Sequence, residues 1–112
     1  MHIRLDPAGP ATLITISGEL DSRSACELDE CLAKLFEKSR YKLVVDLNKI
    51  EYMDSSGYSR LVGGLKVCYR NGGYLVVVSK NKAINEVLIG TRMDTIFKLS
   101  KSVEEAIALF TG

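Results

Sequence analysis

Histidine and cysteine are scarce in this sequence, and their scarcity restricts the chemistry that the chain can perform. The single histidine, His2, lies beside the chain start, where mobility is expected, so a Ser-His-Asp triad has no placed base. The three cysteines, Cys26, Cys31 and Cys68, form no C-x-x-C pair. The sequence therefore predicts no metal site, no cofactor and no catalytic constellation.

Long apolar runs and an excess of one charge are also missing. No run approaches membrane-spanning length, and residues 1–6 lack the apolar segment of a signal peptide. The formal net charge is +1, with no dominant basic patch, so we expect no direct contact with nucleic acid. The odd cysteine count without a framework spacing favours reduced thiols. These observations predict a cytoplasmic protein that does not contact the membrane.

The composition that remains is that of one globular domain. Hydrophobic residues make up 46% and charged residues 26% of the 112 positions, which argues against disorder. A chain of this length can bury one real core. We therefore expect a single domain over residues 1–112.

Hydrophobic periodicity predicts an alternating α/β chain of order β-β-α-β-α-β-α-β-α. Turns are expected at Pro7–Pro10 and at Asn48-Lys49, and the chain is expected to leave the sheet at Gly18–Asp21. Capping boxes are expected to begin at Ser24 and at Ser102. Strands are expected near residues 3–6, 12–17, 43–47, 74–78 and 96–99, and helices near 25–38, 58–69, 81–88 and 103–110.

This order indicates a mixed, mostly parallel sheet of four to five strands with about four helices. The first two strands would pair as an antiparallel hairpin at one edge, and the later strands would join through right-handed crossovers. Function in such sheets tends to lie at the carboxyl ends of strands. Within the second helix, Gly63-Gly64 costs about 1 kcal/mol per glycine, which predicts close approach of another backbone, with the sheet favoured as that neighbour.

One stretch, Met53–Gly57, lies where a predicted strand gives way to a predicted helix. The free N–H groups and the dipole of a helix N-terminus favour negative charge, so a phosphate on Ser55 would be well placed there. The residue types equally fit a plain helix cap. Asp21, Asp46 and Asp54 are expected near one end of the sheet, where paired carboxylates could do acid–base work, but surface aspartates are usually solvated or cap helices.

Three motifs in this order resemble the STAS domain, and in particular the bacterial anti-sigma factor antagonists. They are Gly18-Glu19-Leu20-Asp21 after a strand, Tyr52–Gly57 before a helix, and Asn71-Gly72-Gly73 before an apolar strand. The resemblance covers almost the whole chain, and Asp54-Ser55-Ser56-Gly57 is its most specific part.

The resemblance implies a switch rather than an enzyme. In that family the unmodified protein binds an anti-sigma factor that is also a serine kinase, and so frees a sigma factor; phosphorylation breaks the complex, and a PPM-type phosphatase restores it. The implied phosphoacceptor is Ser55, with Ser56 as the alternative. The implied partner-binding residues are Glu19, Asp21, Asp54, Ser56, Gly57 and Tyr58.

The sequence departs from the family pattern at Tyr58-Ser59, where Leu-Gly is frequent, and at Thr91–Asp94, which puts that local turn in doubt. Tyr58 would either anchor the partner or pack against the sheet. Two other functions stay open: a STAS subunit of a larger transporter or signalling complex without phosphorylation control, and a small enzyme acting through Ser55. The oligomeric state is not predicted.

Overall fold

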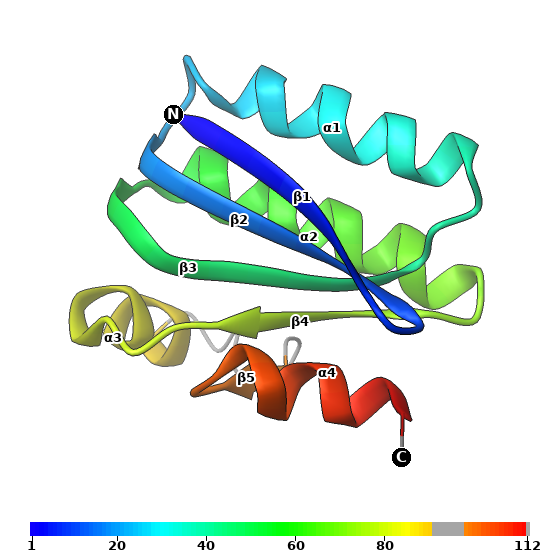
Figure 1. Cartoon of the computed structure of the whole chain (residues 1–112). Helices are drawn as coiled ribbons and strands as arrows, with labels where there is room; N and C mark the ends of the chain where they lie inside the picture. The colour runs from blue at the N-terminus through cyan, green and yellow to red at the C-terminus, as the bar shows by residue number, and fades with distance from the viewer. Residues whose placement is uncertain (91–97, 112) are drawn as a thin grey trace.

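The computed structural model describes residues 1–90 and 98–111, which form one sheet covered by helices (Figure 1). The element order agrees with the prediction: β1 (His2–Ala8), β2 (Ala11–Leu20), α1 (Ala25–Glu37), β3 (Lys42–Met53), α2 (Ser55–Arg70), β4 (Tyr74–Val78), α3 (Lys82–Gly90), β5 (Lys98–Ser100) and α4 (Val103–Thr111).

Within these residues the sheet has five strands in the order β1-β2-β3-β4-β5. The β1–β2 hairpin is antiparallel, and each later neighbour is parallel, so the predicted mixed sheet with an antiparallel edge is confirmed. Every parallel pair is joined by a crossover that contains a helix, as parallel strands require.

The core has two parts because β3 and β4 are covered on both faces. Side chains of successive strand residues point to opposite faces, and so Leu43 and Val45 pack towards α1 and α2 while Val44 packs towards α4. All three are fully buried. The continuous apolar run that predicted a central strand is therefore explained by helices on both sides. No helix within the described ranges is long and apolar enough to cross a membrane.

Two strands run further than predicted. Asn48-Lys49 is no turn, because β3 continues to Met53, and Gly18–Leu20 stays in β2 rather than leaving the sheet. The added length comes from parallel pairing of these two strands beyond the end of β4, which places Leu20 beside Met53. Irregularities in register at Thr15/Ser17 and Gly18/Glu19 explain why simple alternation failed to predict this part. At the other end, β1 continues through Pro7 to Ala8, so the turn is shorter than predicted.

The two predicted capping boxes differ in outcome. Ser102 Oγ accepts a hydrogen bond from the N–H of Glu105 at 3.1 Å, which is one of the two hydrogen bonds of the predicted box, so Ser102 caps α4. Ser24 makes no cap to α1, and its hydroxyl instead donates to the carbonyl of Glu19 at 2.8 Å. That prediction was wrong because the loop before α1 competes for the same hydroxyl.

The prediction that another backbone approaches Gly63-Gly64 was wrong, because the close neighbours are side chains, they lie at Gly64 alone, and the nearest belongs to a helix rather than to the sheet. A Cβ on Gly64 would lie 3.1 Å from Cδ1 of Leu32 in α1 and 3.5 Å from Cδ1 of Leu75 in β4, whereas one on Gly63 would meet nothing within 4 Å. Gly64 therefore sets the spacing between α2 and α1. The predicted break at Thr91–Asp94 and the first half of the strand predicted at 96–99 lie outside the described residues.

Candidate functional site

Asp54 caps α2 and organises its N-terminus. Its backbone is extended, and its Oδ1 accepts hydrogen bonds from the N–H groups of Ser56 at 3.0 Å and Gly57 at 3.3 Å. The N–H of Tyr58 donates to the Asp54 carbonyl at 3.2 Å. The carboxylate thus occupies two of the donors that would otherwise attract an anion. The cap predicted from the sequence is confirmed, and Asp54 is the residue that supplies it.

Ser55 is the first residue of α2 and is exposed, whereas Ser56 is half-buried. Within the described part of the chain, the Ser55 hydroxyl makes no hydrogen bond, although the Ser55 carbonyl accepts one from Ser59 Oγ at 2.8 Å. Of the two serines, Ser55 therefore has the more accessible oxygen.

Gly57 lies where α2 meets the ends of β2 and β3. A Cβ at this position would lie 2.8 Å from Cγ of Leu20, from the Leu20 carbonyl oxygen and from Cγ of Met53. The N–H of Asp54 also donates to the Leu20 carbonyl at 3.3 Å. Glycine is thus required by close approach, and the contact joins the strand that carries Glu19 to the helix that carries Ser55.

The β2–α1 loop uses Asp21 to build its own turn. Asp21 Oδ1 accepts hydrogen bonds from the N–H groups of Arg23 at 3.0 Å and Ser24 at 3.1 Å, as well as from the Ser24 hydroxyl. The bond from the Ser24 N–H is the main cause that lowers the pKa of the Asp21 carboxyl below 3.8. Glu19, at the end of β2, is exposed. Asp21 is therefore an ionised, preorganised group beside the α2 N-terminus.

Tyr58 packs inside the protein rather than on its surface. The residue is 3% exposed, and its hydroxyl donates to the Ile84 carbonyl of α3 at 3.4 Å. Burial raises the pKa of the phenol above 10.0. Of the two roles open from the sequence, packing is the one observed, because α3 covers this side of α2.

The predicted gathering of Asp21, Asp46 and Asp54 is only partly found. Asp54 donates its N–H to Leu20, next to Asp21. Asp46 lies within β3, paired with Thr15 and Val78, most of a strand away from Asp54. The expectation was wrong for Asp46 because β3 continues well past Leu47. Among the described residues, no three His, Cys, Asp or Glu side chains are grouped so that they could hold a metal ion.

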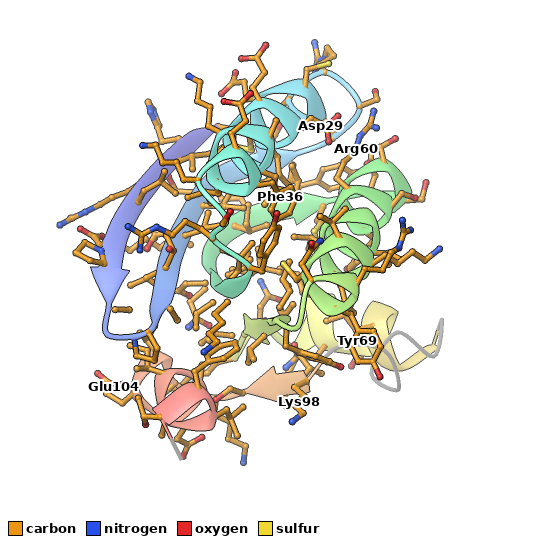
Figure 2. The ribbon with its side chains drawn as sticks, turned by 90° about the vertical axis from the view of Figure 1, so that its right-hand side faces the viewer. Asp29, Phe36, Arg60, Tyr69, Lys98 and Glu104 are labelled. Atoms are coloured by element: carbon orange, nitrogen blue, oxygen red, sulfur yellow. The ribbon has the colours of Figure 1, made fainter. Side chains whose placement is uncertain are left out.

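An ion pair joins the two helices beside this site. Arg60 of α2 and Asp29 of α1 face one another in Figure 2, with Nη1 and Oδ2 3.3 Å apart. Both side chains are 45% exposed, so the pair contributes little to stability. No local sequence pattern predicts this pair or the hydrogen bonds to the Leu20 and Ile84 carbonyls, because each of these contacts joins elements that are distant in the chain.

Comparison with known proteins shows which protein family this chain resembles. The model of the STAS domain family matches residues 2–106. An anti-sigma-B factor antagonist of Staphylococcus epidermidis is 26% identical over 91 residues, covering 81% of this chain and 84% of the relative.

Solved structures resemble the whole chain. The crystal structure of an anti-sigma factor antagonist from Mycobacterium paratuberculosis has a TM-score of 0.90 at 22% identity, covering 99% of this chain and 94% of that one. The Bacillus cell fate determinant SpoIIAA in its phosphorylated form has a TM-score of 0.76 at 17% identity, covering 97% and 99%. At these identities the likeness shows the fold.

Proposed function

The chain belongs to the STAS domain family, and from this we propose that it is an anti-sigma factor antagonist switched by phosphorylation of Ser55. The unphosphorylated form binds an anti-sigma factor that is also a serine kinase, and this binding releases a sigma factor. The single observation that carries the proposal is the exposed Ser55 at the first position of α2, directly after the capping Asp54. The protein acts by binding, with no catalytic role for its own residues.

The hydrogen bonds around Ser55 explain how a phosphate would act. Asp54 already occupies the N–H groups of Ser56 and Gly57, so a phosphate on Ser55 finds those donors taken. The added charge of about −1.5 to −2 would stay at the surface beside the Asp54 carboxylate. A partner surface shaped for a neutral hydroxyl would then face a concentrated negative charge. A penalty of about 1.4 kcal/mol weakens binding tenfold, so a modest repulsion suffices.

The proposed partner-binding surface comprises Ser55, Ser56 and Asp54 of the α2 N-terminus with Glu19 and Asp21 of the neighbouring strand end and loop. Gly57 and Tyr58 are buried and support this surface by positioning α2. Gly57 lets the helix approach Leu20, and Tyr58 holds the helix against α3. A PPM-type phosphatase would restore the unmodified hydroxyl. The antagonists among the relatives, and the solved phosphorylated form of SpoIIAA, support this proposal.

Peptide mapping over Lys49–Arg60 of protein recovered from its native cells tests the acceptor. We expect a phosphate on Ser55. Phosphate on Ser56 would keep the mechanism and move the acceptor. Absence of phosphate under every growth condition, with the protein in a stable transporter or signalling complex, would favour the alternative of a STAS subunit without phosphorylation control.

Binding to the cognate anti-sigma factor tests the consequence. Ser55→Glu is expected to weaken binding at least about tenfold, and Ser55→Ala is expected to retain it. Thr111→Glu, at the exposed end of α4, adds the same charge elsewhere and serves as the control. If phosphorylated protein bound as tightly as unmodified protein, the switch would be refuted.

A further inference from the structure

The strand β1 forms an open edge of the sheet. Among the described residues it pairs only with β2, and Figure 1 shows it at the outer side of the sheet, away from β5. Gly9, with φ of +62°, and Pro10 form the two-residue loop between the paired residues Ala8 and Ala11. Glycine at the first loop position fits a type II′ hairpin, whose closing pair is hydrogen-bonded.

This hairpin geometry determines which backbone groups face outward. In an antiparallel ladder, hydrogen-bonded and non-hydrogen-bonded pairs alternate, so with Ala8 bonded to Ala11 the backbone groups of Ile3, Leu5 and Pro7 point away from β2. Pro7 agrees with this assignment, because it has no N–H to donate to β2. The outer edge therefore offers two donors and three acceptors.

Two apolar side chains of β1, Ile3 and Leu5, lie beside a hollow. Leu5 is 45% exposed, and Ile3 is half-buried against the core. A hollow of about 420 Å³ lies between β1 and α1, large enough to receive an apolar side chain. On the helix side it is lined by Glu27, Glu30, Cys31 and Lys34.

The charges that flank Leu5 are self-complementary. Arg4 and Asp6 stand on either side of it and form an ion pair, with Nε and Oδ2 2.9 Å apart. In an antiparallel pair centred on Leu5, Arg4 of each copy lies opposite Asp6 of the other. We propose that β1 pairs with β1 of a second copy of this chain about a two-fold axis at Leu5, which makes one continuous sheet.

The same axis pairs both outward donors of each copy with acceptors of the other. The N–H of each Leu5 meets the carbonyl of the other, and each Ile3 N–H meets a Pro7 carbonyl. A foreign strand has no reason to match this charge order, which is why a second copy is the preferred occupant.

The proposed dimer interface is small, and it lies away from the proposed phosphorylation site. Pro7 removes one donor per copy and shortens the ladder, so a reversible dimer is expected. Ser55 follows β3, two strands in from the β1 edge. The pairing therefore does not depend on the proposed function.

Sedimentation velocity from low micromolar to millimolar protein tests the pairing. Wild-type protein should dimerise as concentration rises. Arg4→Asp and Asp6→Arg each place like charges opposite one another twice, and each should weaken dimerisation about tenfold or more. An equimolar mixture of the two variants restores opposite charges and should form heterodimers, and the double exchange of both residues should restore the homodimer.

Lys101→Asp is the control, because it changes the net charge as Arg4→Asp does at an exposed position after β5. It should leave dimerisation unchanged, and circular dichroism should show the same fold in every variant. Monomers at all concentrations, a dimer unaffected by either single exchange, or a mixture no better associated than its components would each overturn the proposal.

Discussion

Asp54 and Gly57 act on the α2 N-terminus in different ways. The Asp54 carboxylate accepts hydrogen bonds from the free N–H groups. Gly57 has no side chain, which leaves room for the helix to contact Leu20 and Met53. The first effect is electrostatic and the second is steric. Both place the Ser55 hydroxyl at the surface.

The steric effect is tested by Gly57→Ala. A new Cβ would lie 2.8 Å from a backbone carbonyl and two core side chains, so we expect the free energy of unfolding to fall by about 1–3 kcal/mol. Gly63→Ala is the matched control in the same helix, where the Cβ meets nothing and helix propensity should add about 0.5–1 kcal/mol. Urea denaturation measures both. A destabilisation of equal size in the two variants would contradict the close approach.

Asp21 provides a pH-dependent test of the neighbouring loop. Hydrogen bonds from the Ser24 and Arg23 N–H groups lower its folded-state pKa below 3.8. The carboxylate therefore adds stability above the unfolded-state pKa, and this contribution is lost as the pH falls through the folded-state pKa. Carboxyl NMR titration, with Asp21→Asn to assign the resonance, should give a value under 3.8. A value at or above 3.8 would mean that the turn is not held by this carboxylate.

At the scale of elements, α2 connects the site to α3 through Tyr58. The phenol is one helical turn from Ser55, and its hydroxyl bonds to the Ile84 carbonyl. Docking of α3 against α2 therefore depends partly on one buried side-chain bond, in addition to the packing of Ile84 and Leu88 in the core.

Tyr58→Phe tests that connection. The substitution removes the bond from the hydroxyl to the Ile84 carbonyl, so we expect a loss of at most about 1 kcal/mol, given its length of 3.4 Å. Amide hydrogen exchange should quicken in α3 more than in α1. Tyr69→Phe, at a tyrosine that is 71% exposed, should change neither quantity. Equal exchange in α3 of the variant and the wild type would argue against the bond.

At the scale of the whole molecule, one sheet separates two apolar clusters that share β3. The cluster towards α1 and α2 contains Val45, and the one towards α4 contains Val44. Because adjacent residues of one strand belong to both, the two layers are expected to unfold together.

Paired valine substitutions test this cooperativity. Val44→Ala and Val45→Ala each remove fully buried methyl groups and should each lower the free energy of unfolding by about 2 kcal/mol. Each variant should show one transition in urea, with the same midpoint by circular dichroism and by tyrosine fluorescence. Separate transitions in the Val44→Ala variant would show that α4 unfolds independently.

Local residue patterns determined the element order, the mixed sheet and the position of Ser55 at a helix start. Alternation in strands, apolar spacing in helices and the residue types at Asp54–Gly57 act over a few neighbours, so they can be read along the chain. The same locality explains the mistaken turn at Asn48-Lys49, since nothing near it signals that β2 pairs with β3 as far as Met53.

The tertiary structure alone decided which of these residues are exposed and which face the core. Tyr58 is buried because α3, distant in sequence, covers it, and Asp46 is remote from Asp54 because β3 extends between them. Gly57 is required because β2 ends beneath it. Burial and close approach are set by elements far apart along the chain, and their meeting depends on the packing of the whole sheet.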